Sequence, residues 1–267
     1  MPNLRMPKRP LVRLAAATGV LVAAALLPVN ALARDVAIPF DPANFSDPTR
    51  IDNPLFPLVP GRTYVYRAKG ADGCEENHFT VTDQTKVVAG VTTRVIHDIA
   101  YEDPECDGSL EKIEDTFDWH AQDNAGNVWY FGEDTDDCAN GVCTPGPGSW
   151  EAGVNGALAG LYMLAPPRKG DQYFQEIAKG IAEDQAAVVG TELRVAVAEP
   201  VSLFGGFAYQ SSFSGCLKTK DFTALAPGST EHKFYCPARG SFSGGLVAVD
   251  ELHGRTVRFE LVRVSGP

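Results

Sequence analysis

Short runs rich in Val, Thr, Tyr and Phe, separated by Gly and Pro, restrict the fold of this 267-residue chain more than any other feature. The 26 Gly and 19 Pro residues recur between the runs at spacings typical of β-hairpins. We predict an all-β fold in which a single antiparallel meander of about eleven strands curls into a barrel or half-open barrel-like sheet. The predicted strands are Thr63–Ala68, His78–Thr82, Thr92–Tyr101, Leu110–Gln122, Asn127–Glu133, Gln172–Ala178, Glu192–Ala198, Ala208–Thr223, Thr230–Tyr235, Gly245–Leu252 and Thr256–Val264.

At most one short helix is expected. Apolar residues between Ala178 and Val189 fall near a 3.6-residue period, although a strand fits this stretch nearly as well. Residues 34–62 are polar and rich in Pro, which predicts an extended N-terminal segment packed on the core. No repeat or linker divides residues 63–267, so we predict one β domain there.

The first 33 residues predict a cleavable signal peptide. Basic residues precede an apolar run from Leu14 to Leu27, and Ala31-Leu32-Ala33 provides a small-x-small cleavage pattern. That run is shorter than the roughly 20 residues a membrane-spanning helix needs. We therefore expect a protein that is periplasmic or secreted and not held in the membrane after cleavage.

The net charge narrows the range of partners. Cleavage after Ala33 removes four basic residues and no acid, which moves the formal net charge from −11 to −15. Such an acidic protein repels nucleic acid and anionic membranes and attracts cations or basic ligands. We expect a small-molecule ligand and no nucleic-acid partner, and the oligomeric state stays open.

Six cysteines, all after residue 33, predict three disulfides in an oxidising compartment. Cys138 and Cys143 flank an Asn-Gly turn and form the simplest bridge. Cys74 and Cys106 lie in acidic loops of neighbouring hairpins, which leaves Cys216 with Cys236. A zinc site would need thiolates at shorter spacing, so no metal site is predicted.

The segment Glu114–Glu133 predicts a hairpin around the turn Asp123–Asn127, where Gly126 can adopt a positive φ. Alternation places one acid, Asp115, on an otherwise apolar face. If that face lines the interior, Asp115 and Glu133 lie among aromatic rings, where burial would suit them to acid or base work. The more ordinary interpretation is that both lie at strand ends near solvent. The face of Asp115 holds Ile113, Phe117, Trp119 and Ala121, and the opposite face holds Glu114, Thr116, Asp118, His120 and Gln122.

Three motifs carry a resemblance to a known group of proteins. They are Asn53-Pro-Leu-Phe-Pro-Leu-Val-Pro-Gly61, Asp118-Trp-His-Ala-Gln-Asp123 and Gly126-Asn-Val-Trp-Tyr-Phe-Gly-Glu133. With these, the chain resembles uncharacterised exported bacterial proteins that are rich in β-structure, over most of its length. The resemblance implies export and β-structure and carries no activity. The resemblance also includes Ser149-Trp-Glu-Ala-Gly153, Gln175-Glu176, Ala182-Glu-Asp184 and a last motif, Glu231-His-Lys-Phe-Tyr235. Where that last motif would end in Tyr-Ala-Pro, this chain has Tyr235-Cys-Pro237, which fits an added bridge to Cys216.

Common catalytic motifs are missing from the sequence. Gly240-Ser-Phe-Ser-Gly244 has Phe where a serine hydrolase elbow needs Ser, and no Walker loop or dinucleotide fingerprint occurs. The acidic run that starts at Asp134 lacks the Gly and Glu of an EF-hand loop. The five histidines show no metal-binding spacing, and we predict no cofactor.

Two functions remain open. The first is a binding protein for a small apolar or sugar-like ligand, held on a concave side formed by Trp119, Trp129, Phe131, Trp150, Tyr162 and Phe174. The second is an exported hydrolase or lyase that uses a pair of inward carboxylates chosen from Asp118, Glu133, Glu176 and Asp184. Catalytic residues stay unassigned. The predicted ligand-binding residues are Asp118, His120, Trp129, Tyr130, Glu133, Trp150, Glu176, Asp184 and His232.

Overall fold

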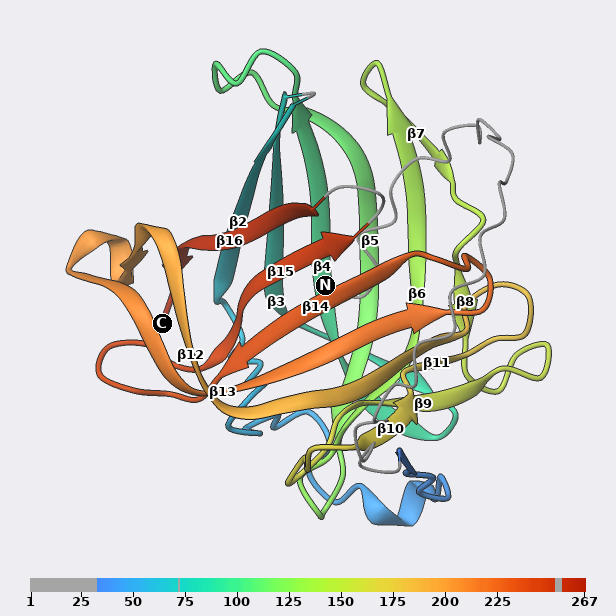
Figure 1. The fold of residues 1–267 in the computed structure, drawn as a ribbon. Coiled ribbons are helices and arrows are strands. Elements are labelled where there is room, and N and C mark those ends of the chain that lie inside the picture. Colours follow the sequence, from blue (N-terminus) through green and yellow to red (C-terminus); the bar gives the residue numbers. More distant parts are fainter. Residues whose placement is uncertain (1–32, 72, 253–255) are drawn as a thin grey trace, which may run out of the picture.

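The prediction of an all-β protein is confirmed. The computed structural model describes residues 33–71, 73–252 and 256–267, so the predicted signal peptide lies outside the described residues except for Ala33. The described chain forms one large mixed sheet of sixteen strands (Figure 1). It contains two 3-10 turns, η1 (Pro42–Asn44) and η2 (Phe204–Gly206), and no α-helix within those residues.

Two meanders of long strands make up most of the sheet. The first runs through β2 (Thr63–Gly70), β3 (Gly73–Val88), β4 (Val91–Asp103), β5 (Glu111–Gln122) and β6 (Val128–Ala139). Each of these strands is antiparallel to the one before it. Turn residues separate them, and Gly126 adopts φ 88° in the β5–β6 turn, which confirms the predicted hairpin.

The second meander follows the same antiparallel pattern. Its strands are β12 (Asp184–Leu203), β13 (Ala208–Thr223), β14 (Thr230–Cys236), β15 (Gly245–Leu252) and β16 (Thr256–Ser265). Strand β16 pairs antiparallel with β2 and so joins the two meanders. In Figure 1 the orange and red strands of the second meander cross in front of the green strands of the first at a steep angle.

Short strands complete the sheet at its two ends. They are β1 (Arg34–Asp35), β7 (Val142–Pro145), β8 (Trp150–Glu151), β9 (Leu158–Met163), β10 (Asp171–Phe174) and β11 (Glu176–Ile177). Strand β9 extends the first meander from β6 and pairs with β11, while β10 extends the second from β12. One residue, Gln175, separates β11, at one end of the strand order, from β10, which is next to the other end.

The predicted strand count and the purely antiparallel pattern are wrong. Of the five strands beyond the predicted eleven, β1, β7, β8 and β11 are only two to four residues long, too short for a compositional signal, and β9 has six residues. The sheet is mixed because β1 pairs parallel with β10, and β12 pairs parallel with β16. The stretch with helical period, Ala178–Val189, contains a bridge between Ala178 and Ala182 and the start of β12, so its strand interpretation is correct.

The three predicted disulfides are confirmed. Cys74 bonds Cys106, Cys138 bonds Cys143 and Cys216 bonds Cys236. No cysteine of the described residues is left free. Since disulfides persist in oxidising compartments, they agree with an extracytoplasmic location. Among the residues that the structure describes, no helix is long and apolar enough to cross a membrane.

Aromatic side chains from both meanders meet on one side of the sheet. Phe56, from the N-terminal segment, has its ring centre 5.7 Å from that of His120 on β5 and 6.1 Å from that of Tyr235 on β14. It also lies 4.5 Å from the ring of Tyr162 on β9. We call the side of the sheet that faces these rings the inward face and the other side the outward face.

Candidate functional site

Strands β5 and β6 place four of the predicted site residues on the inward face. Asp118 pairs with Glu133 and His120 pairs with Tyr130 across the two strands. Strict alternation would put Tyr130 and Glu133 on opposite faces, but the register shifts between Asp118 and His120. This irregularity, a β-bulge of the kind that re-aims side chains, brings the four residues together.

Gly132 makes a close approach of β8 to β6 possible. Its φ is 133°, and a Cβ atom there would lie 2.2 Å from the carbonyl oxygen of Trp150. Only glycine combines that backbone conformation with that contact. As a result the Trp150 ring packs edge-on against Tyr130, with ring centres 5.4 Å apart.

Tyr130 links two buried carboxyl groups through its hydroxyl. The hydroxyl oxygen lies 2.7 Å from Oδ1 of Asp118 and 3.0 Å from Oε2 of Glu133. The hydroxyl is the donor toward both carboxyl oxygens. Burial, reinforced by the charge of Asp98, raises the pKa of Asp118 well above its usual range.

His120 is a neutral acceptor beside this pair. Its ring stacks on Tyr130 at 4.7 Å, and burial lowers the pKa of His120 to about 3. Nδ1 lies 3.3 Å from the carbonyl oxygen of Trp129, to which it donates. The other ring nitrogen, Nε2, is then an acceptor, and no hydrogen-bond donor among the described residues reaches it.

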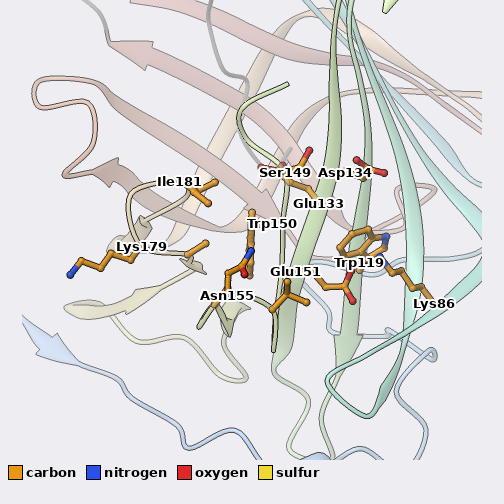
Figure 2. A pocket seen from close by; sticks show the side chains of 13 residues that line it. Lys86, Trp119, Glu133, Asp134, Ser149, Trp150, Glu151, Asn155, Lys179 and Ile181 are labelled. Carbon is orange, nitrogen blue, oxygen red and sulfur yellow. Dashed lines mark hydrogen bonds and ion pairs between the residues drawn. The ribbon is translucent and has the colours of Figure 1, made fainter. Parts of the chain in front are cut away.

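A surface cleft of about 320 Å³ borders this buried group (Figure 2). Glu133 and Trp150 line the cleft and also contact Tyr130, so they connect it to the inward face. At its other side Lys86 lies 3.3 Å above the centre of the Trp119 ring and 2.8 Å from Oε2 of Glu151. The cleft thus combines two indole rings with several charged groups.

A second buried polar group lies on β13, β14 and β15. Lys233 Nζ is 3.1 Å from Oδ2 of Asp221 and 3.2 Å from Oε2 of Glu231. Glu231 stands directly opposite Glu251 in the sheet. Burial, together with the charges of Glu231 and Glu75, raises the pKa of Glu251 to about 8.

Tyr162 lies between the two buried groups. Burial raises its pKa, Lys233 opposes that rise, and Asp221 and Asp118 add to it. The charges of both groups therefore reach the same hydroxyl. The inward face carries one extended polar region enclosed by aromatic rings.

The structure brings six of the nine predicted site residues together. Glu176 is also buried, and burial, with the charges of Asp118, Glu133 and Glu176, raises the pKa of Tyr130 well above its usual range. The six residues are Asp118, His120, Tyr130, Glu133, Trp150 and Glu176.

Three predicted site residues lie elsewhere. Trp129 points to the outward face, where Nε1 donates to Asp123 at 2.9 Å. Asp184 begins β12 and pairs with Thr223 in the sheet. Lys233, the residue after His232 on β14, points inward. The half-buried ring of His232 therefore points outward.

The predicted assignment of the inward face is wrong. Asp115 is an outward residue that pairs with His97 at 2.7 Å and Lys112 at 2.6 Å. Aromatic residues on that face are covered by the N-terminal segment, as Phe40 shows by packing 5.7 Å from Phe131. Of the predicted concave lining, Trp150 and Tyr162 belong to the inward region, Phe174 is 47% exposed, and Trp119, Trp129 and Phe131 lie outward.

Sequence reasoning missed the second buried group. Lys233 is only 3% exposed, and its polar neighbours in Thr230–Cys236 give that strand the appearance of an exposed one. The available clue was alternation, which places Glu231, Lys233 and Tyr235 on one face. Across the described part of the chain, no three His, Cys, Asp or Glu side chains are grouped closely enough to hold a metal ion.

Comparisons with known proteins add little to this geometry. No protein-family model matches the chain, and no curated protein matches it. One similar solved structure is that of a protein described as a lipoprotein from Parabacteroides distasonis, at 12% identity and a TM-score of 0.38. The similarity covers 79% of this chain and 97% of that one. At this level it carries no argument about function.

Proposed function

We propose that this is an exported protein, periplasmic or secreted, that binds a small sugar-like ligand in the cleft and on the adjoining inward face. The curled sheet then acts as a barrel-like container, with Glu133 and Trp150 at its entrance. The cleft volume of about 320 Å³ suits a ligand of one or two sugar rings. The resemblance to exported bacterial proteins is consistent with this location.

The observation that carries the proposal is a set of buried polar atoms beside aromatic rings. Within the described residues, Oδ2 of Asp118, Nε2 of His120 and Nε1 of Trp150 have no hydrogen-bond partner. A buried polar atom without a partner costs about 1–3 kcal/mol. A ligand rich in hydroxyl groups would satisfy these atoms, whereas an apolar ligand would not.

The hydrolase or lyase alternative finds less support. Asp118 and Glu133 lie close enough to form an acid pair, because both touch one hydroxyl. However, the Tyr130 hydroxyl occupies the space between them, where a bond to be cleaved would have to lie. Asp118 is also fully buried instead of facing an open cleft. This arrangement favours binding over hydrolysis.

Thermal unfolding of the mature, disulfide-bonded protein tests the proposal. Millimolar glucose, galactose and xylose are added singly, since a ligand that binds only the folded state raises the melting temperature. At least one sugar should do so in the wild type. Absence of any shift, together with native mass spectra of the exported protein that show no bound small molecule, would overturn the proposed function.

Two tryptophan variants provide the matched comparison. Trp150→Phe removes an indole N–H at the cleft, whereas Trp129→Phe removes one that already binds Asp123 on the outward face. The sugar-induced shift should decrease in Trp150→Phe and persist in Trp129→Phe. Equal behaviour of the two variants would exclude the cleft as the binding place.

A further inference from the structure

Two turns supply aliphatic side chains to the cleft beside Trp150. The connection between β8 and β9 provides Val154 and Ala157, and the connection between β11 and β12 provides Ala178 and Ile181. The two alanines are buried, whereas Val154 is 47% exposed and Ile181 is 40% exposed. The cleft therefore has an apolar part that is open to solvent.

The fold itself does not account for Val154 and Ile181. Neither side chain belongs to the hydrophobic core of the described residues. Gly153 and Gly156, with φ 86° and 82°, flank the first turn position, and Gly180, with φ 74°, precedes Ile181. Turns of this kind usually carry polar residues. A single exposed apolar residue needs no explanation, but two from separate turns that line one cleft indicate a binding surface.

Trp150 provides a hydrogen-bond donor in the same cleft. The residue is only 6% exposed, and no acceptor within the described residues reaches its Nε1. An indole N–H can donate but cannot accept, so it needs an oxygen or a similar acceptor from a bound molecule. In the view of Figure 2, Trp150 stands between Ile181 and Trp119. The donor thus lies within a cleft that also offers aliphatic contacts.

The charged groups of the cleft do not require a charged ligand. Lys86 Nζ lies 2.8 Å from Oε2 of Glu151, so these two charges balance each other. Figure 2 shows the ammonium group of Lys179 pointing away from Trp150. The side chain of Asp134 is exposed, and water solvates its charge. A neutral ligand that combines an acceptor oxygen with an apolar group fits this lining.

We infer that the ligand is an amphiphilic glycoside, in which a neutral sugar is joined to an alkyl or acyl chain. This inference rests on the proposed function and specifies its ligand. The sugar lies beside Trp150, whose indole N–H donates to one of its oxygens, and the chain packs against Val154 and Ile181. A bare sugar would leave these two aliphatic side chains in water, and a plain hydrocarbon would leave the indole N–H without an acceptor.

A protein partner matches this surface less well than a short chain does. A stable protein–protein interface buries about 800 Å² on each partner. Val154 and Ile181, each about half exposed, supply only a small part of such an area. A chain of a few methylene groups covers both side chains, and the cleft volume of about 320 Å³ leaves room for one sugar ring beside it.

Calorimetric titration with glycosides of increasing chain length tests the inference. The probes are methyl, butyl and hexyl β-glucosides and the matching β-galactosides, all below the concentrations at which they form micelles. Each methylene group that becomes buried increases affinity about fourfold. With the mature wild-type protein, the butyl glycoside of at least one sugar should therefore bind at least ~10-fold more tightly than its methyl glycoside. The heat capacity change on binding should also be more negative for the butyl compound.

A pair of threonine variants locates the chain. Val154→Thr combined with Ile181→Thr should reduce the ratio of butyl to methyl affinity to under about threefold, because the chain then meets hydroxyl groups. Val142→Thr is the matched control, since Val142 is 64% exposed on β7 and does not line the cleft. It should keep the wild-type ratio. Trp150→Phe should weaken both glycosides and leave their ratio unchanged, because it removes only the donor to the sugar.

The outcomes separate this inference from the proposed function. Equal binding of methyl and butyl glycosides would overturn the inference and leave sugar binding intact. Hexanol is the control for the chain alone, and if it binds as tightly as the hexyl glycosides, the inference is wrong because the sugar contributes nothing. If no glycoside binds, the inference is also wrong, and the melting experiments with unsubstituted sugars and the native mass spectra decide whether the binding function fails. Should the double variant not fold, the comparison of chain lengths in the wild type still decides.

Discussion

Asp115 and Asp118 lie three residues apart on β5, but their side chains lie in opposite environments. Asp115, on the outward face, contacts His97 and Lys112, and these contacts outweigh its burial and lower its pKa. Asp118, on the inward face, is fully buried, and its pKa is raised. The difference shows that the available partners, not the residue type, decide which carboxyl group stays ionised in this sheet.

The same contrast holds for the basic groups. On the outward face Arg258 binds both Asp250 and Glu260, so one cation serves two acids in a partly exposed network. On the inward face Lys233 serves Asp221 and Glu231 in almost complete burial. Loss of an inward cation should therefore cost far more than loss of an outward one.

The largest effect is expected for Lys233→Met. Removal of this cation leaves the buried Asp221 and the partly buried Glu231 without their positive partner, which should lower the free energy of unfolding by about 3–5 kcal/mol. Urea denaturation measures the change. Lys220→Met, an exposed residue above the Phe222 ring on β13, is the matched control and should cost under about 1 kcal/mol. Similar decreases in the free energy of unfolding in both variants would mean that burial on the inward face does not increase the contribution of Lys233 to stability.

A pH titration of stability sharpens the comparison for Glu251. Its folded-state pKa of about 8 exceeds the unfolded value, so the folded state binds the extra proton. The free energy of unfolding should therefore fall as the pH rises from about 5 to 9. Glu251→Gln should remove about 3–4 kcal/mol of this fall. The variant should match the wild type near pH 5 and exceed it at pH 9.

Asp250→Asn provides the control for that titration. Asp250 precedes Glu251 on β15 but points outward to Arg258, at 2.6 Å. This variant should keep the loss of stability between pH 5 and 9. If Glu251→Gln keeps it as well, the inward carboxyl is already ionised in the folded protein, and the contrast between the faces is wrong there.

Gly132→Ala tests whether the close approach of β8 holds the cleft residues in place. The new methyl group would overlap the Trp150 carbonyl oxygen, so β8 must move, at a cost of about 2–3 kcal/mol. Gly141→Ala is the control, because Gly141 also has a positive φ but no atom near its Cβ position. It should cost about 1 kcal/mol. Tryptophan fluorescence, which includes Trp119 and Trp150 beside Gly132, should change in the first variant and not in the second.

Composition and spacing were sufficient to predict the β class, the three disulfides and the β5–β6 hairpin. These depend on local signals such as the turn at Gly126 and the placement of the cysteines. The face of β5 was not predictable in this way. The outward face of the hairpin is apolar as well, because the N-terminal segment covers Phe131 and Trp129 of β6 from outside.

The buried polar region shows a second limit of sequence reasoning. The irregular register beside Asp118 brings Tyr130 and Glu133 to one face, and simple alternation separates them. Lys233 and Glu251 are charged residues on strands distant from β5, and charged residues are usually exposed. Their burial depends on the crossing of the two meanders, which no local pattern encodes.

The smallest expected effect belongs to Glu76, an outward acid on β3. Its Oε1 lies 2.6 Å from Nε2 of His78, and its Oε2 lies 3.0 Å from Nε of Arg67. The contact with His78, opposed by burial and supported by Arg67, lowers the pKa of Glu76 to about 2. The stabilisation is therefore present above about pH 4.5 and lost as the pH falls toward 2. Since Arg67 is 57% exposed, solvent screening limits it to about 1 kcal/mol.

Glu76→Gln should thus lower the free energy of unfolding by about 1 kcal/mol at pH 7 and by almost nothing near pH 2. At neutral pH Glu76→Gln should lower the free energy of unfolding relative to the wild type. Glu251→Gln should raise it relative to the wild type, by an amount that increases with pH. The double variant should show the sum of the two effects, because the two residues act on opposite faces of the sheet. Urea denaturation of all four proteins at pH 3, 5, 7 and 9 measures both slopes. If both variants shift the free energy of unfolding in the same direction at neutral pH, the two faces of the sheet do not differ in how they affect carboxyl groups.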